Sequence, residues 1–375
     1  MLLGYDMKPK KSKILPTGKL DNNLLKEIFK EYNSPQMAKK LENSSFRDNY
    51  KDSDKRVKLG FAIGEDAAVI TMQNSNKCIV AKTDPITFAT EDIGYYVVNV
   101  NANDIAAMGA TPKWFQATIL LPAGTATEVL VKKICTDIQK ACLDLGIVLI
   151  GGHTEVTYGL NRPIVIGSMI GEVSENQYVQ SSGGKPGDAI ILTKGIPLEG
   201  TSIIAREKEN ELLEHGISQD VINKAKNLLY TPGISVVKEA MLDVKHFSVH
   251  AMHDPTEGGL AGALSEVASA SGNGIRIYYE RVMISKETRR LCDLFAIDPL
   301  TLISSGALII TTNISEVPTL LQALTDAGIP SADIGEMLKD SIARELIMPD
   351  GIVKVLQKPS QDALWTALKR KKTRK

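Results

Sequence analysis

Apolar runs of strand length alternate with helix-length segments from residue 67 to residue 327 of this 375-residue chain. In the first half, the pattern predicts strands at 67–72, 78–83, 114–121, 147–152 and 163–173, and helices at 92–108 and 125–145. In the second half, it predicts strands at 188–195, 248–252, 274–279 and 307–313, helical segments up to about residue 242, and helices at 257–270 and 315–327. Such alternation in both halves predicts two α/β or α+β domains of similar size.

A polar, glycine-rich stretch separates the two halves and indicates the domain boundary. We expect an N-terminal extension at 1–57, a first domain at 58–175, a second domain at 176–350 and a basic C-terminal tail at 351–375. Within the extension, residues 20–32 are amphipathic and predict a helix, whereas residues 42–56 are polar and predict a loop.

Positive charge gathers at the two ends of the chain, although the formal net charge is zero. Residues 369–375 hold six basic residues and no acid, and residues 1–20 hold five lysines and one aspartate. The remaining residues are acidic, with 33 basic and 43 acidic side chains. A basic tail can bind nucleic acid or simply be a solvated chain end. Because an acidic body offers no face for nucleic acid, we expect no such partner.

The sequence shows no membrane or export signal. No apolar run approaches the roughly 18–20 residues that a membrane helix needs, and the N-terminus lacks the apolar core of a signal peptide. None of the four cysteines forms a C-x-x-C pair, which argues against a zinc ribbon or a disulfide framework. Cys135 and Cys142 lie seven residues apart on one predicted helix and are expected to be core thiols. We therefore expect a cytoplasmic protein with reduced thiols.

Carboxylates lie near strand ends in the first half of the chain. Asp66 precedes the first predicted strand, Asp84 directly follows the second, and Asp104 lies in an apolar stretch of the next helix. Ionised groups rarely sit unpaired in apolar surroundings. Oxygen ligands with few histidines favour Mg²⁺, which commonly bridges protein carboxylates to substrate phosphates. The pattern leaves two interpretations open, a magnesium site or ordinary caps and turns.

The helix that contains Asp104 also carries carboxamides. Asn99 and Asn103 are one helical turn apart and share a face. An amide beside a carboxylate can hold a phosphate and a metal.

Two glycine pairs could bring the backbone close to a bound group. The run 147–152 is predicted to be a short buried strand that ends in two glycines, and the motif GGHTEV at 151–156 continues it. It matches neither the P-loop nor the dinucleotide fingerprint, and a simple turn explains it equally well. The motif HDPTEGGL at 253–260 opens a predicted helix whose N–H groups form a potential anion site. Asp254 and Thr256 in this motif are also good N-cap residues.

Six segments of the chain occur in an order that resembles a known superfamily. They are GEDAAVI, KTDPITFATEDIG, VNANDIAAMGATP, GGHTEV, KPGDAIILTKG and HDPTEGGLAGALSEVA. Together, over residues 58–345, they resemble the superfamily of aminoimidazole ribonucleotide synthetase, and within it the HypE-like hydrogenase-maturation dehydratases. The resemblance implies a two-domain PurM-like fold. In such a fold the N-terminal domain pairs with a second copy as a dimeric β-barrel-like core, and a C-terminal α/β domain packs on each protomer.

The resemblance also implies ATP and Mg²⁺ as cofactors, bound in a cleft between the domains near the interface of a homodimer. Matched by position, the metal ligands are Asp66, Asp84, Asp104 and Glu155. The residues matched to ATP and its phosphates are Lys82, Asn103, Gly151, Gly152, Thr154 and Asp254. Asp84, Asp104 and His153 are assigned as catalytic.

The activity implied by the resemblance is ATP-dependent transfer of a phosphoryl group to a small-molecule oxygen, with release of ADP. The acids would act by positioning the metal and the phosphates rather than by covalent attack. Two alternatives are a nucleotide-binding regulatory or assembly protein without turnover, as in hydrogenase maturation, and a small-molecule kinase resembling thiamine-monophosphate kinase.

Three departures from the relatives narrow the expected substrate. HypE ends in a cysteine that carries the carbamoyl group, whereas this chain ends in KRKKTRK and its last cysteine is Cys292. We therefore do not expect dehydration of a thiocarbamate. No cysteine precedes Cys78, so we do not expect the activity of selenophosphate synthetase. TDPITFAT replaces the D-G-V-G-T-K-like segment of the purine enzyme, which leaves the acceptor open.

Overall fold

Residues 24, 56–60, 64–87, 89 and 91–369 are described by the structure, a computed structural model. The helix predicted at 20–32 and the loop at 42–56 lie outside the described residues, apart from Leu24 and Arg56. Within the described part, no helix combines the length and the apolar character needed to cross a bilayer.

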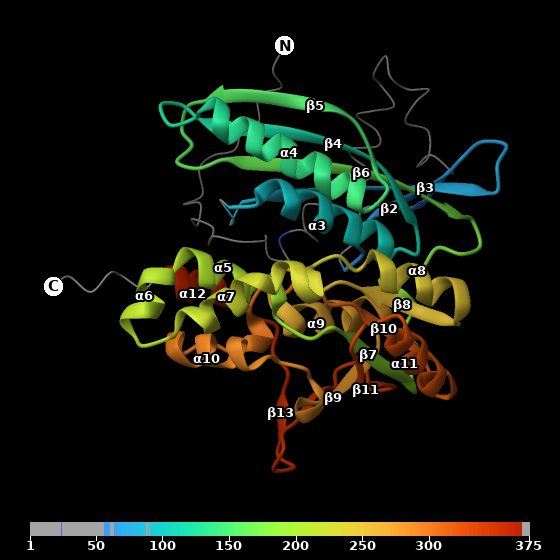
Figure 1. Cartoon of the computed structure of the whole chain (residues 1–375). Coiled ribbons are helices and arrows are strands. Elements are labelled where there is room, and N and C mark those ends of the chain that lie inside the picture. The colour runs from blue at the N-terminus through green and yellow to red at the C-terminus, as the bar shows by residue number, and fades with distance from the viewer. Residues whose placement is uncertain (1–23, 25–55, 61–63, 88, 90, 370–375) are drawn as a thin grey trace, which may run out of the picture.

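A six-stranded sheet builds the first half of the fold, with two helices against one of its faces (Figure 1). Its strands are β1 Val57–Leu59, β2 Ala68–Thr71, β3 Lys77–Ile86, β4 Thr111–Pro122, β5 Val148–Thr157 and β6 Ile164–Ser174, and its helices are α3 Ile93–Ala107 and α4 Glu128–Asp144. The strand order is β1-β2-β3-β6-β4-β5, and only β4 and β5 are parallel. Along β6, buried residues alternate with partly exposed ones because helices cover one face only.

Two glycines of β6 allow α3 to pack closely against the sheet. A Cβ at Gly167 would overlap the side chain of Asn101, and a Cβ at Gly171 would overlap that of Ile105. Both partners belong to α3. The face of the sheet that carries these glycines therefore faces α3, and Ser168 and Ile170, which alternate with them, face away from it.

Strand β5 differs from the prediction for residues 147–152. It begins at Val148, extends to Thr157 and is exposed along almost its whole length. An apolar run predicts a strand but does not say how many strands or helices cover it. Strand β5 lies at an edge of its sheet, which explains its exposure. Gly152 does not end the strand; a Cβ there would overlap the carbonyl oxygen of Ala117 on β4. Close approach of two strands therefore explains this glycine.

A seven-stranded sheet organises the second half, in the order β13-β12-β9-β11-β7-β10-β8. Its strands are β7 Asp188–Thr193, β8 Val249–His253, β9 Gly274–Tyr278, β10 Ile309–Asn313, β11 Ser331–Leu338, β12 Arg344–Ile347 and β13 Val353–Val355. The helices are α5 Leu198–Glu207, α6 Glu209–Glu214, α7 Gln219–Asn227, α8 Val237–His246, α9 Gly259–Ser271, α10 Lys286–Phe295, α11 Val317–Asp326 and α12 Ala363–Lys369. Short helices lie at η2 Ser181–Gly183, η3 Leu229–Gly233, η4 Tyr279–Arg281, η5 Pro299–Thr301 and η6 Ile314–Glu316.

Helices cover both faces of this second sheet. Leu264 and Val267 of α9 pack in one apolar cluster with Ile190 and Leu192. Ile191, the residue between these two on β7, packs on the other face in a cluster that includes α8 and α11. Every residue of β7 is buried as a result, which explains its continuous apolar run.

The alternation of strands and helices is confirmed in both halves, but the C-terminal part of the chain is more ordered than predicted. Helices α10 and α12 and strands β11 to β13 were not predicted from the sequence. β13 pairs with β12, and Leu364 of α12 is fully buried in the largest apolar cluster. The stretch 353–369, placed in a basic tail on sequence alone, therefore belongs to the second half of the fold.

The prediction that Cys135 is a core thiol is wrong, because its side chain is exposed while Cys142 is buried. The buried side of α4 consists of Ile134, Ile138, Ala141 and Cys142. Seven residues fall about 20° short of two full helical turns. Cys135 therefore lies about 20° farther round the helix than Cys142, beyond the edge of the buried stripe.

Candidate active site

Helix α3 lies between the first sheet and the second half of the fold (Figure 1). Among its residues, Asn103 makes two hydrogen bonds to the second half. Its Nδ2 donates to the carbonyl oxygen of Ile234, and its Oδ1 accepts from the N–H of Val236, each at 2.8 Å. Buried polar groups must find such partners, so this carboxamide fixes α3 relative to the loop that precedes α8. Its assignment to phosphate binding stays a prediction.

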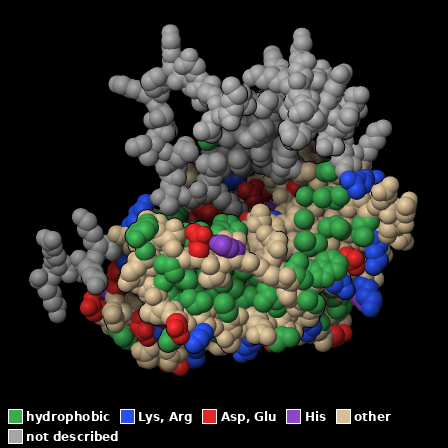
Figure 2. Space-filling view, turned by 90° about the horizontal axis from the view of Figure 1, so that it is seen from above, with side chains coloured by type: hydrophobic (Ala, Val, Ile, Leu, Met, Phe, Trp, Pro, Cys, Tyr) green, Lys and Arg blue, Asp and Glu red, His purple; other side chains and the backbone are tan. Residues whose placement is uncertain are grey.

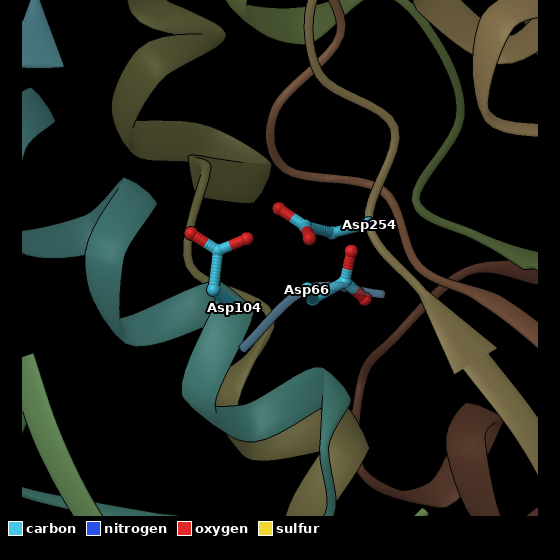
Figure 3. Close-up of side chains that lie close together, drawn as sticks. All are labelled: Asp66, Asp104 and Asp254. Atoms are coloured by element: carbon cyan, nitrogen blue, oxygen red, sulfur yellow. The ribbon is translucent and has the colours of Figure 1, made fainter. Parts of the chain in front are cut away.

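Three buried aspartates from distant parts of the chain meet where the two halves join (Figure 3). Asp66 precedes β2, Asp104 lies on α3, and Asp254 directly follows β8. One carboxylate oxygen from each residue lies within 4.8 Å of those of the other two. Their exposed fractions are 6%, 3% and 1%. The structure therefore brings Asp66 and Asp104 together as predicted, and adds Asp254, which the sequence assigned to phosphate.

Lys82 of β3 lies next to this cluster. Its Nζ is 3.3 Å from Oδ1 of Asp104 and 3.5 Å from Oδ2 of Asp84. The backbone of Asp84 is held by Asn101, whose Oδ1 accepts from its N–H at 2.9 Å. Sequence reasoning missed Asn101, although this residue lies in the segment VNANDIAAMGATP that was singled out. Asp84 is the most exposed of the four aspartates, with 33% of its side chain accessible.

His253 is the second cation at the cluster, and the sequence analysis did not assign it a role. Its Nδ1 is 2.7 Å from Oδ1 of Asp66, and its Nε2 is 3.3 Å from Oε2 of Glu266. Because both partners are carboxylates, both ring nitrogens donate, and the ring is an imidazolium. Burial lowers the pKa of His253, but the Asp66 and Glu266 carboxylates outweigh it and hold this pKa well above its usual range.

Burial is the main cause of the pKa shifts of the aspartates. It raises the pKa of Asp104 well above the usual range, against the opposing effect of the Lys82 ammonium. Burial and the neighbouring Asp66 carboxylate raise the pKa of Asp254 to about 7. Oδ2 of Asp104 and both carboxylate oxygens of Asp254 have no hydrogen-bond partner among the described residues.

These unpartnered oxygens fit a divalent cation. Four aspartate side chains lie around Lys82 and His253, and burial favours the protonated form of Asp104 and Asp254 unless a cation takes the place of the proton. A buried carboxylate without a partner is unfavourable by several kcal/mol, at about 1–3 kcal/mol or more for each lost hydrogen bond. An all-oxygen donor set is what Mg²⁺ and similar hard cations prefer.

The anion site predicted at the start of α9 has an occupant from the chain itself. Oδ2 of Asp362 accepts from the N–H of Gly258 at 2.7 Å, and Oδ1 accepts from Leu364 at 2.8 Å. Asp362 is 2% exposed. A carboxylate thus takes the place that the sequence analysis left to an external anion. Asp362 was missed because it lies 104 residues along the chain from Gly258.

His153 and Glu155 lie on β5, and in one copy of the chain they face away from α3. His153 pairs in register with Thr118, and Thr118 pairs with Ile166. Because neighbouring residues in register share a face, and Gly167 next along the chain faces α3, His153 faces the opposite side. The side chains of His153 and Glu155 are 64% and 50% exposed.

Three other predicted site residues, Gly151, Gly152 and Thr154, lie on the same edge strand. Strand β5 is three strand positions from β3, which is about 14 Å at the usual spacing. Glu155 is not part of the carboxylate group found among the described residues. The assignment of these β5 residues to a nucleotide site stays a prediction, and in this geometry it requires a second copy of the chain.

The fold and the site together define a two-domain α/β protein with a carboxylate-lined centre at the domain junction. Residues 64–173 match the family model of the N-terminal domain of AIR synthase related proteins, and residues 185–346 match that of their C-terminal domain. The chain therefore belongs to the AIR synthase related family. The family predicted from the sequence and the PurM-like two-domain fold are both confirmed.

Individual relatives agree with this family. A protein of Methanocaldococcus jannaschii named for hydrogenase expression and formation is 31% identical over 275 residues, covering 72% of this chain and 77% of the relative. The carbamoyl dehydratase HypE of Cupriavidus necator is 26% identical over 290 residues, covering 74% and 78%. A crystal structure of HypE in complex with ATP is similar, with a TM-score of 0.62, 20% identity and coverage of 89% and 98%. The expectation of a family that includes enzymes is thus confirmed.

Proposed function

We propose that this protein is a Mg²⁺-dependent enzyme that uses ATP to phosphorylate an oxygen of a small molecule and releases ADP. The observation that carries the proposal is the group of three buried carboxylates at the domain junction, with oxygen atoms that no protein donor satisfies. The names of two similar proteins support it, since one is a carbamoyl dehydratase and the other was solved as a HypE complex with ATP.

Asp66, Asp104 and Asp254 are the residues that would hold the cation. A magnesium ion bound there would neutralise charge on the phosphates of ATP and keep them in line for transfer. The protein supplies a water-poor setting, since the three ligands come from separate segments of the chain and each is almost fully buried. Pre-set geometry of this kind is what phosphoryl transfer asks of a protein.

Lys82 and Asp84 have different tasks in this proposal. The ammonium of Lys82 lies between two carboxylates and can shift toward the phosphate oxygens, where it balances their charge. Asp84, which is accessible to solvent, accepts the proton of the acceptor group as its oxygen forms the new bond to the γ-phosphorus. The bond from that phosphorus to the β–γ bridging oxygen breaks at the same time, and ADP leaves with the electron pair.

A homodimer is part of the proposal, because the first sheet leaves apolar side chains uncovered. On β5, Val148, Leu149, Ile150 and Val156 are between 43% and 58% exposed. Seen from above, hydrophobic side chains gather on this side of the molecule (Figure 2). Exposed apolar areas of this kind mark interaction surfaces. The prediction for His153 requires a second copy of the chain, and this exposed edge strand offers apolar surface for one.

The proposal is tested by following ADP release from Mg-ATP in the presence of a panel of acceptors that contain hydroxyl, amide or thiocarbamate oxygen, and thiamine monophosphate. Stimulated ADP release by one acceptor is the expected result. Tight ATP binding without stimulation by any acceptor would favour a regulatory or assembly protein instead. Stimulation by thiamine monophosphate alone would favour the kinase alternative.

The metal assignment has its own test, in which ATP affinity is measured by calorimetry with and without Mg²⁺. Asp104→Asn keeps the size of the side chain but removes its charge, and should weaken Mg-ATP binding by tenfold or more, a factor worth about 1.4 kcal/mol. Asp144→Asn, at an exposed position of α4, is the matched control. Equal Mg-ATP affinity in both variants would remove Asp104 from the metal site.

A further inference from the structure

We propose that His253 is a positioning residue that orients Asp66 for cation binding, and that Glu266 and Lys358 link this histidine to the C-terminal segment. The C-terminal segment is defined as residues 356–369, which follow β13 and include α12. Cation affinity at the domain junction then depends on how this segment is seated. The inference rests on the proposed function, since it concerns the regulation of the same cation site.

Asp66 precedes β2 and belongs to no strand or helix, so the backbone around it does little to orient its carboxylate. The second half of the fold supplies that orientation. Nδ1 of His253 is 2.7 Å from Oδ1, and Oγ of Ser181 donates to Oδ2 at 3.3 Å. His253 is itself 5% exposed and ends β8, a strand paired with β10 inside the second sheet. A ligand on an irregular segment is thus fixed by a side chain from a rigid element.

The other edge of the imidazole leads to the C-terminal segment. Nε2 of His253 is 3.3 Å from Oε2 of Glu266, and Oε1 of Glu266 accepts from Nζ of Lys358 at 2.9 Å. Acidic and basic groups therefore alternate from Asp66 through His253 and Glu266 to Lys358. Asp66, His253 and Glu266 each use two polar atoms in these contacts. Lys358 ends the series at the surface, where its side chain is 41% exposed. A shift of the segment is thereby passed to the ring that holds Asp66.

The same segment has a second contact next to the site. Asp362 accepts from the N–H of Gly258, which lies four residues after the cluster residue Asp254. The C-terminal segment thus has two contacts with α9. Asp362 of the segment binds the start of the helix, and Lys358 binds Glu266 on the second turn of the helix. Two anchors on one helix fix the position of the segment relative to both Asp254 and His253.

The structure contains a matched control for His253 on the same strand. His250 of β8 also pairs with a buried aspartate, since its Nδ1 is 2.8 Å from Oδ2 of Asp188. Asp188 is 3% exposed but is not part of the carboxylate cluster. Loss of either histidine removes one close polar contact between β8 and a buried acid. Only loss of His253 removes a partner of a proposed metal ligand.

The test measures the affinity of the full chain for Mn²⁺, used as the probe, from the signal of the free ion in electron paramagnetic resonance. His253→Gln should raise the dissociation constant about ten- to a hundredfold, the range seen when groups that orient metal ligands are replaced. His250→Gln should change it by less than about twofold. Lys358→Met, at an exposed position, should raise it about two- to fivefold, while Lys354→Met on β13 should leave it unchanged.

The possible results separate the two proposals. If the unaltered chain binds Mn²⁺ and both His253→Gln and Lys358→Met bind it equally well, the positioning role is wrong and the cation site stands. If the unaltered chain binds no Mn²⁺, the proposed cation site fails, and the inference fails with it. Thermal unfolding without metal shows whether His253→Gln folds; if it does not, the surface variants Lys358→Met and Lys354→Met decide the question.

Discussion

Asp243 lies in the interior of the second half of the fold and gives a sharp prediction about stability. It is 0% exposed on α8, and neither of its carboxylate oxygens has a hydrogen-bond partner among the described residues. Burial, and then the Glu239 carboxylate one helical turn earlier, raise the pKa of Asp243 to about 8. The usual value is 3.8. The folded chain therefore keeps a proton here over a range of pH in which the unfolded chain has lost it.

The sign follows from that difference in bound protons. Between pH 4 and pH 8 the folded state binds more protons at Asp243 than the unfolded state, so stability falls as pH rises, by up to about 1.4 kcal/mol for each pH unit. From pH 5 to pH 8 the loss from this group amounts to about 4 kcal/mol. Asp243→Asn has a similar shape but no titration. It should therefore gain about 4 kcal/mol relative to the unaltered chain over the same range.

Urea unfolding at pH 5, 6, 7 and 8 measures this gain directly. The free energy of unfolding of Asp243→Asn minus that of the unaltered chain should grow steadily with pH. Asp144→Asn, at an exposed site on α4, should show a difference that stays within about 0.5 kcal/mol throughout. A difference for Asp243→Asn that is the same at all four pH values would refute the argument, because it would mean that Asp243 is ionised in the folded protein.

Two further predictions concern residues that hold the fold around the site. Gly152→Ala should destabilise the protein by more than about 2 kcal/mol in chemical denaturation, because the new Cβ overlaps the backbone of β4. Gly151→Ala has a similar φ but open space for the Cβ, and should lower the free energy of unfolding clearly less. Equal losses in the two variants would show that φ alone matters. Asp362→Ala should lower the free energy of unfolding by about 3 kcal/mol, because the buried N–H of Gly258 and one other N–H lose their acceptor. An unchanged thermal midpoint for Asp362→Ala would mean that water replaces the carboxylate.

Local sequence patterns were enough to predict most of the elements, and the failures have physical causes. Helix α10 was missed although Leu291, Cys292 and Phe295 are spaced as on one helical face and are all buried; that signal was available. Strand β11 gave no such signal, because a register shift between Asp333 and Gly335 breaks its alternation. The edge position of β5 depends on strand order, which no local pattern contains.

The candidate site was only partly predictable for a related reason. Asp66 stood out as an acid directly before a predicted strand, and Asp104 as an acid in an apolar stretch of a helix, and periodicity could say no more than that. Their approach to Asp254 joins segments 188 and 150 residues apart, so the link between them came from the resemblance to a known superfamily rather than from spacing. His253 had one available signal, its place directly before Asp254 in a motif that was singled out.

Helix α3 shows most clearly why spacing along a helix misjudged the site. Asn99 and Asn103 were paired because they share a face, yet within the described part of the chain Asn99 bonds to its own helix, at the carbonyl of Tyr95. The polar residues that build the site point in different directions from the helix axis instead, because successive residues are rotated by about 100°. Asn101 holds β3 at Asp84, Asn103 holds the second half of the fold, and Asp104 faces the carboxylate cluster. A buried helix has no solvent side, so each direction around it serves a different neighbour. One short run of polar residues can therefore bind two domains together and still present a ligand between them.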